Sequence, residues 1–485
     1  MIQKILQWIR EAFQKMIGQT SIKQVLHVDV TMSQPMVLAL DLWCKMYENK
    51  APWLSDEVVS LNLPSAISSE IARSATIEMK MKIDGSSRAE FLQQQMDVYI
   101  PKMRQYVEYG VAKGGLIMKP YIVGKTIAVD FVQADQFYPI AFNARGDIIS
   151  CVFADQRMQH GKYFTRLEYH DMKDHSCVIK NLAYKSDSPT TLGTQVPLSS
   201  IQDWEDLAES ATIQDIEKPL FAYFKYPLAN NIDVTSPLGV SCYSRAVTLI
   251  EEADRQWSDL LWEFESGRRA LYVDVLAFKK DSNGRPMLPN RRLYRTLETG
   301  SAEGEMYHEW TPSFREASIL SGLDAILKKI EFACGLAYGT ISDPNTEDKT
   351  ATEIKISKQR TAATITDTQK TLQNALDQLL YAMDVWATLG KLSTSGKFEA
   401  TYTFDDSIVT DYEMQFTQDS KAINMQVMSK VEFRMRNYGE SEEVAKKKLK
   451  DVAAEQEMAI EQDDLMPKQM QKPPQKGQPK PPFGK

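Results

Sequence analysis

Apolar side chains along residues 317–338 recur at alternating steps of three and four, the spacing of an amphipathic helix. Lys328, Lys329 and Glu331 fall off this stripe. The pattern predicts one helix with a single buried seam. The seam consists of Leu320, Leu323, Leu327, Ile330, Cys334 and Ala337.

Residues 342–348 interrupt the helical pattern with a short polar loop. Pro344 cannot continue the preceding helix, and it biases Asp343 away from helical backbone angles. Thr350 and Glu353 then stand three apart, as in a capping box, before a long run without Pro or Gly. We therefore expect one very long helix over 350–390, with a heptad seam at Ile365, Leu372, Leu379 and Trp386.

Residues 35–110 have a mainly helical pattern, whereas strand-like runs dominate from Gly114 to about Phe224. Each run is bounded by Gly, Asn or Asp, which are typical turn residues. This arrangement predicts a series of β-hairpins. The runs are 115–123, 126–132, 137–142, 148–153, 163–170 and 177–184.

A second helix is predicted over 241–266, although Asp254 interrupts its apolar seam. The residues that follow lose the helical pattern. They contain a strand-like run at 270–278, and the chain comes back towards the next helix through 306–310. A small mixed module is thus inserted between two helices. Its basic cluster suits either phosphates or acidic residues of a partner, and it comprises Arg291, Arg292 and Arg295.

Beyond Gly390 the sequence predicts a strand at 398–404 and helices between 414 and 462. Residues 466–485 are rich in Pro and Lys and contain no acidic residue, so we expect a disordered basic tail. Strands and helices are segregated along the chain rather than alternating. The predicted fold class is therefore α+β.

The formal charge of −8 argues against a general nucleic-acid binder, which needs clustered Lys and Arg. Five widely spaced cysteines without a C-x-x-C motif favour a reduced, intracellular chain. Residues 1–17 form an amphipathic pattern, expected to dock on the fold itself or on a neighbouring subunit. No apolar stretch approaches the ~20 residues of a membrane span, so we expect no membrane partner.

Candidate chemistry is sparse, and we expect no catalytic residue, cofactor or metal site. Gly124-Lys125-Thr126 is similar to the end of a phosphate-binding loop, but it lies between two strand-like runs and is better interpreted as a hairpin turn. The loop 343–348 lacks the Gly and Glu that an EF-hand needs. His170, His175 and Cys177 match no strong metal-ligand spacing and are interpreted as surface hairpin residues.

Gly335 and Gly339 lie four residues apart near the end of the first predicted helix. They permit either a close helix contact or the termination of that helix. The spacing alone leaves both interpretations open.

Several stretches, in this order, resemble the portal proteins, or head-to-tail connectors, of long-tailed bacteriophages, especially those of phages and prophages of Gram-positive bacteria. None is a catalytic signature, and the resemblance rests on their order over about residues 1–460. The stretches are 42–53 (LWCKMYENKAPW), 133–140 (QADQFYPI) and 335–344 (GLAYGTISDP), the last running into 349–354 (KTATEI).

The resemblance implies a portal fold with a helical stem, a small mixed clip, a β-containing wing and a helical crown. The implied division is wing 1–240, stem helix 241–267, clip 268–316, stem helix 317–339, tunnel loop 340–349, long wing helix 350–399, crown 400–465 and tail 466–485.

The resemblance also implies a ring, usually of twelve subunits, at one capsid vertex of the virion, assembled in the host cytoplasm. Its implied partners are terminase, head-tail adaptors, the major capsid and scaffold proteins, and double-stranded DNA that passes through without sequence specificity. The implied tunnel-loop residues are Ser342, Asp343, Asn345, Thr346, Glu347, Asp348 and Lys349, with Lys328 and Lys329 in the channel stem and Arg291, Arg292 and Arg295 as clip contacts.

Two alternatives to a portal remain at this point. The first is a nucleotide-dependent DNA enzyme that uses Gly124-Lys125-Thr126. The second is a scaffold-like protein that assembles without enclosing a channel.

Overall fold

The computed structural model describes residues 22–267, 270–274, 294–297, 307–310, 313, 315–343, 351–404, 412–438 and 440–464, with the backbone alone described at 270–274, 294–297, 307–310, 351–358, 412–415 and 454–464. The chain divides into two compact units, residues 1–405 and 406–485. The combination of helical bundles and antiparallel sheets confirms the expected α+β class.

Between residues 34 and 113, four helices and a short 3-10 turn form the N-terminal part of the first unit, as the helical pattern predicts. Helix α3 has Pro64 in its first turn, where the missing N–H of proline leaves no bond unmade. Helix α5 ends at Gly114, whose φ of +86° favours glycine. The elements are α2 (Gln34–Tyr47), α3 (Leu63–Thr76), α4 (Ser87–Met96), η1 (Ile100–Lys102) and α5 (Met103–Lys113).

Two antiparallel sheets follow, and the predicted hairpins are confirmed. A three-stranded sheet has the order β10-β2-β3, and a six-stranded sheet has the order β4-β5-β6-β7-β8, with β9 also paired to β7. Strands β5 and β6 extend beyond the predicted runs. The strands are β2 (Gly115–Val123), β3 (Thr126–Gln133), β4 (Phe137–Phe142), β5 (Ile148–Gln159), β6 (Lys162–Lys173), β7 (Ser176–Ser186), β8 (Thr194–Val196), β9 (Ser210–Gln214) and β10 (Ala222–Lys225), with short turns η2 (Leu198–Ser200) and η3 (Gln202–Trp204).

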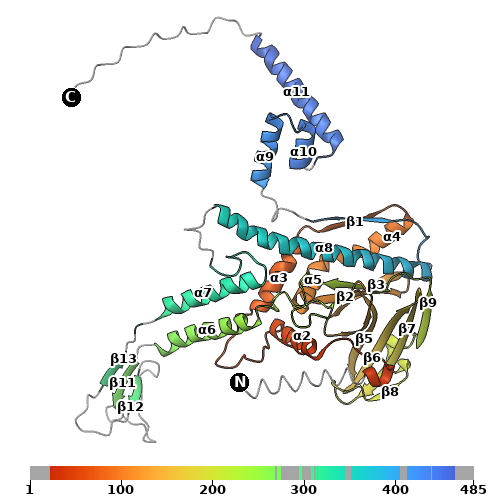
Figure 1. The fold of residues 1–485 in the computed structure, drawn as a ribbon, viewed down its shortest axis with the longest axis vertical. Coiled ribbons are helices and arrows are strands. Elements are labelled where there is room, and N and C mark those ends of the chain that lie inside the picture. The colour runs from red at the N-terminus through yellow and green to blue at the C-terminus, as the bar shows by residue number, and fades with distance from the viewer. Residues whose placement is uncertain are drawn as a thin grey trace. The chain divides into compact units, whose positions relative to one another are not determined.

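The predicted long helix is confirmed as α8 (Ala351–Leu389), which lies across the N-terminal helices and the three-stranded sheet (Figure 1). Its heptad residues Ile365, Leu372 and Leu379 are buried in the main hydrophobic core together with residues of α3, α5 and β2. The seam is thus covered by the rest of the first unit, because a helix cannot bury its own apolar face.

Several strands of this unit, among them β1 (Lys80–Asp84), were not predicted. Strand β1 lies in a region with a mainly helical pattern and pairs antiparallel with β14 (Glu399–Thr403). The pairing joins segments more than 300 residues apart in sequence, which no local pattern reveals. Strand β14 therefore belongs to the first unit, and the division between the two units falls after Asp405.

Helices α6 (Val247–Ser266) and α7 (Glu316–Ala333) lie side by side and carry a small three-stranded sheet at one end (Figure 1). Helix α6 starts six residues later than predicted, because Cys242 and Tyr243 are held by the body of the unit. The Cys242 amide donates to the Val111 carbonyl at 3.1 Å, and the Tyr243 hydroxyl donates to the Trp43 carbonyl at 2.9 Å. The small sheet comprises β11 (Ala270–Asp274), β12 (Tyr294–Leu297) and β13 (Tyr307–Trp310), in the order β12-β11-β13.

The described part of the second unit, within residues 412–464, contains three helices. Helices α9 and α10 meet through Phe416 and Phe433, whose ring centroids are 5.3 Å apart. Glu440, between α10 and α11, accepts two hydrogen bonds from Arg434 and one from Lys448. The helices are α9 (Tyr412–Asn424), α10 (Lys430–Tyr438) and α11 (Glu442–Asp464).

Candidate channel segment

Helices α6 and α7 form an antiparallel pair, here called the stem pair, and an ion pair closes its outer end. Arg315 donates to Glu263 through its amide at 3.0 Å and through its guanidinium at 2.8 and 3.3 Å. These bonds hold the pKa of Glu263 below its usual range. The end of α6 is therefore fixed to the start of α7, on either side of the small sheet.

The inner part of α6 is fixed to the body of the first unit by Asp254. This buried carboxylate accepts hydrogen bonds from the Trp53 indole at 2.9 Å and from the Leu61 amide at 2.8 Å. Burial raises the pKa of Asp254, because the charged form loses hydration. The residue that interrupts the predicted seam thus binds the loop between α2 and α3.

Helix α7 ends at Gly335, which adopts a left-handed φ of +74°. The Leu336 amide donates to the Glu331 carbonyl at 2.8 Å and the Gly335 amide to the Phe332 carbonyl at 3.3 Å, which is a Schellman arrangement. A Cβ at Gly335 would lie 2.6 Å from the Thr364 hydroxyl of α8. Both interpretations left open by the sequence therefore hold at Gly335, which ends a helix and also permits a close helix contact.

Glu331 is completely buried, although the sequence pattern placed it off the seam. Its carboxylate accepts from the amides of Ile341 at 2.6 Å and Ser342 at 2.9 Å. It also accepts from the Ser342 hydroxyl at 2.9 Å and from the Gly339 amide at 3.2 Å. The polar side of the last α7 turn is therefore buried by the chain that follows it, which an isolated helical pattern cannot indicate.

The two candidate stem lysines have different surroundings. The Lys328 ammonium lies 2.5 Å from Asp324, one turn earlier, and this hydrogen bond raises the pKa of Lys328. Asp324 also accepts from the Asp343 amide at 3.2 Å. Lys329 is exposed. The local charge of Lys328 is thus balanced within α7, whereas that of Lys329 is presented to solvent.

The structure brings Ser342 and Asp343 of the expected tunnel loop against α7. Asn345, Thr346, Glu347, Asp348 and Lys349 lie outside the described residues, as do Thr350 of the expected capping box and the side chain of Glu353. Arg291 and Arg292 also lie outside them, and Arg295 is placed only by its backbone, in β12. The N-terminal tail 1–17 and the C-terminal tail 466–485 are likewise outside the described residues.

Sequence reasoning missed three residues of this segment: Glu331, Thr361 and Thr364. The Thr361 hydroxyl accepts from the Ala337 amide at 2.7 Å, and the Thr364 hydroxyl donates to the Gly335 carbonyl at 2.9 Å. One sequence signal existed for Glu331, because a carboxylate near a helix C-terminus opposes the helix dipole and needs another source of stabilisation.

Gly124-Lys125-Thr126 forms the β2–β3 hairpin turn, as predicted. Val123 pairs with Thr126 across the turn, Gly124 has a φ of +60°, and Lys125 is exposed. A phosphate-binding loop instead leads from a strand into a helix, whose N-terminal amides contact the phosphate. This tripeptide therefore lacks the backbone context for nucleotide binding.

The interpretation of His170 and Cys177 as surface residues is wrong. Both are buried, and His170 Nε2 lies 2.7 Å from Glu168 Oε1. Glu168 also accepts from Lys119 at 2.5 Å. Burial alone would raise the pKa of Glu168, but the charges of Lys119, His170 and Arg166 hold it well below its usual value. A buried charge cluster joins β2 to β6 here because strand alternation brings these side chains onto facing surfaces.

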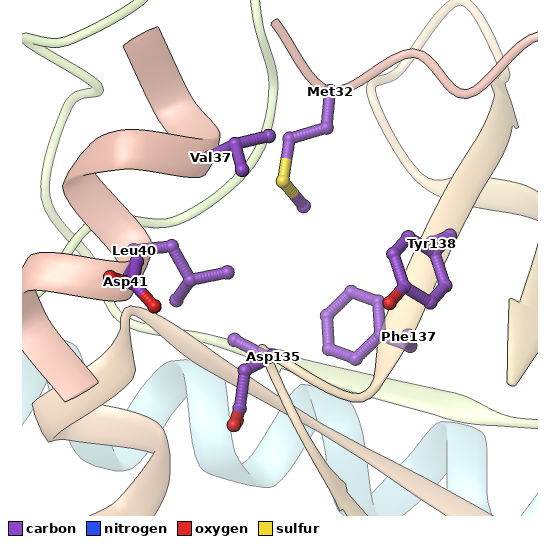
Figure 2. A pocket seen from close by; sticks show the side chains of 8 residues that line it. Met32, Val37, Leu40, Asp41, Asp135, Phe137 and Tyr138 are labelled. Atoms are coloured by element: carbon purple, nitrogen blue, oxygen red, sulfur yellow. The ribbon is translucent and has the colours of Figure 1, made fainter. Parts of the chain in front are cut away.

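A small pocket lies between α2 and β4 (Figure 2). Met32, Val37 and Leu40 face Phe137 and Tyr138 across it, and its two carboxylates already have lysine partners. Asp41 pairs with Lys45 at 3.2 Å and Asp135 with Lys113 at 2.9 Å. Within the described part of the chain, no three His, Cys, Asp or Glu residues are grouped as metal ligands, and no helix is long and apolar enough to cross a membrane.

Comparison with known proteins gives one assignment. A family described as "Phage portal protein, SPP1 Gp6-like" matches residues 95–462. A solved structure titled "Neck of native GTA particle computed with C12 symmetry" shares 10% identity, with 81% of this chain and 91% of that chain covered, at a TM-score of 0.38. No curated protein matches the chain.

Proposed function

The chain belongs to the SPP1 Gp6-like family of phage portal proteins, and from this premise we propose that its copies form a ring at one capsid vertex through which DNA enters and leaves. A portal subunit is a structural component of the virion, and the family is not an enzyme family. The observation that carries the proposal is the extent of the family match, which runs from α4 into α11 and includes the whole stem pair.

The proposed roles follow the order of elements. Residues 1–240 form the wing, the stem pair lines the channel, and the small sheet at its end lies in the clip. The tunnel loop spans 340–349, α8 crosses the wing, and the crown begins after Asp405, where the second unit starts. The antiparallel stem pair with a sheet at its outer end is the arrangement that supports these roles, because one end is fixed to the body and the other projects a separate module.

The proposed partners are terminase and the head-tail adaptors at the clip, and the capsid and scaffold proteins around the wing. Double-stranded DNA passes through the ring without sequence specificity. Translocated DNA must slide, and every phosphate neutralised by Lys or Arg adds a salt-dependent contact. A chain with a net charge of −8, in which Lys328 is already paired with Asp324, offers few such contacts.

A packaging assay tests this function. Particles assembled with the wild-type chain should protect DNA from nuclease when terminase and ATP are supplied, and particles without the chain should not. Replacing Arg291, Arg292 and Arg295 together by Glu should abolish protection while rings still assemble, because the clip would then repel acidic partner residues. Equal protection in particles that lack the chain would contradict the proposal.

Lys125→Ala is the matched control for the enzyme alternative. Lys125 lies at an exposed hairpin turn, so its removal should leave packaging unchanged. ATP hydrolysis by the purified chain that disappears on Lys125→Ala would instead favour a nucleotide-dependent enzyme.

A further inference from the structure

The base of the proposed tunnel loop is bound by a single buried side chain. Both oxygens of Glu331 are used, since Oε1 accepts from the Ile341 and Ser342 amides and Oε2 from the Gly339 amide and the Ser342 hydroxyl. All four donors are neutral. An ionised carboxylate, which only accepts hydrogen bonds, satisfies every one of them.

The same short segment is held from the other side by α8. Thr361 and Thr364 bond the backbone at Ala337 and Gly335, as described above. The Arg360 guanidinium lies over the Phe332 ring at 4.4 Å and over the Tyr338 ring at 5.7 Å. Residues 335–342 are therefore fixed between two helices before the chain reaches the rest of the loop.

The contacts at the two ends of the stem pair show which part of the chain Glu331 holds. The ion pair of Glu263 and Arg315 fixes the opposite end of the pair, far along α7 from Glu331. Glu331 contributes nothing to that closure, so its four bonds act only on the chain after the helix. Because these hydrogen bonds reach only residues 339–342, Glu331 sets where the loop leaves α7.

We propose that Glu331 is a positioning residue of the channel, a buried carboxylate that fixes residues 339–342, the base of the proposed tunnel loop, and thereby supports the retention of DNA. The part of this inference that concerns DNA rests on the proposed portal function. The part that concerns anchoring rests only on the contacts of Glu331.

Glu331→Gln is the sharpest variant because it keeps the size of the side chain. The amide oxygen still accepts from Ile341 and Ser342, but the amide nitrogen cannot accept from the Gly339 N–H, which keeps only its 3.1 Å bond to the Ser342 hydroxyl. Hydrogen–deuterium exchange of the full chain should show the amides of residues 339–342 exchanging about tenfold faster than in the wild type. Unchanged exchange at these amides would overturn the anchoring role.

Glu263→Gln is the matched control, with the same substitution at the other end of the stem pair. It should speed exchange near Arg315 and leave residues 339–342 unchanged. Faster exchange at 339–342 in both variants would show a general loosening of the stem pair and would overturn a specific role for Glu331.

The functional readout is nuclease-protected DNA in particles built from Glu331→Gln rings. Rings should form normally, and the DNA retained after packaging should fall severalfold. Wild-type retention together with faster exchange would overturn the positioning role. Failure of the wild-type chain to form rings would instead refute the portal proposal and leave the exchange result valid.

A milder variant tests the same contacts if Glu331→Gln does not fold. Ser342→Ala deletes one of the four donors, together with a second acceptor of the Gly339 amide, and leaves the carboxylate in place. It should speed exchange of the Ile341 and Ser342 amides by a smaller factor, and no change would count against the anchor.

Discussion

At the scale of single residues, buried charged side chains connect segments of the first unit that lie far apart in sequence. Arg88 is 1% exposed, and its guanidinium donates to the carbonyl oxygens of Asp384, Ser393 and Thr394 at 2.9 to 3.2 Å. Asp384 lies in the last two turns of α8, whereas Ser393 and Thr394 follow the helix. Arg88 thus joins α4 to the end of the longest described helix and to the chain that leaves it.

Arg88→Met should destabilise the first unit by about 3 kcal/mol, because three partly buried hydrogen bonds from a buried guanidinium are lost. Arg88→Lys should restore little, since a single ammonium cannot replace a planar fork that reaches three acceptors. The denaturant midpoint of the full chain measures the effect. Arg73→Met removes an exposed pair with Glu70 and should change stability by no more than about 0.5 kcal/mol. Equal effects at the two positions would contradict the role of Arg88.

Residue-scale features were the least predictable from sequence. Periodicity places Glu331 on a solvent face, and nothing local distinguishes Arg88 from other helical arginines. Glu331 is buried by the chain that follows its own helix, and Arg88 by carbonyls about 300 residues away in sequence. His170 was misassigned because its neighbour Glu168 also binds Lys119, which comes from another strand.

At the scale of elements, most boundaries follow from local rules. The hairpins and α8 lie where alternation, turn residues and the absence of Pro and Gly predict them. Differences arise where tertiary contacts override the pattern. Strand β1 forms because β14 supplies its partner, and α6 begins late because the body of the unit holds Cys242 and Tyr243.

Gly335→Ala tests the helix end that leads into the tunnel loop. Alanine pays the cost of left-handed backbone angles, and its Cβ also collides with the Thr364 hydroxyl, so we expect a loss of about 2–3 kcal/mol. Gly124→Ala is the matched control, because Gly124 is also left-handed but has open space around it. It should lose only about 1 kcal/mol. Equal losses in thermal unfolding would show that the contact with α8 is unimportant.

The junction of α10 and α11 should depend on pH through Glu440. Its hydrogen bonds with Arg434 and Lys448 lower the pKa of Glu440 from the usual 4.5 to about 2. A lowered folded-state pKa gives stability that is fully present above pH 4.5 and lost as the pH falls towards 2.

Glu440→Gln measures that contribution. The helix content of the second unit should be lower in the variant than in the wild type at pH 7. Amide exchange at residues 430–453 measures it. The difference should shrink as the pH falls through the Glu440 pKa of about 2 and vanish below it, where both side chains are uncharged. A difference that persists unchanged below pH 2 would contradict the ion-pair explanation.

At the scale of the whole molecule, the stem pair exposes apolar side chains that a lone subunit leaves in water. Trp262 is 65% exposed, Phe264 47% and Leu320 47%. Exposed apolar surface of this kind marks an interaction site. A heterologous contact repeated by rotation closes into a ring, which would cover these side chains.

Trp262→Glu should therefore raise the protein concentration needed for ring assembly at least tenfold without unfolding the chain, because it places a charge in an apolar interface. Met158→Glu, at a similarly exposed apolar residue of the β5–β6 hairpin, should leave assembly unchanged. Sedimentation across a concentration series distinguishes the two. Identical behaviour of the two variants would remove the stem pair from the interface.

Imaging of the purified full-length protein by electron microscopy tests the central claim most directly. A portal subunit should appear as closed rings with a central hole and one rotational symmetry. A population of monomers or compact dimers without a hole, at concentrations where the chain is folded, would contradict it.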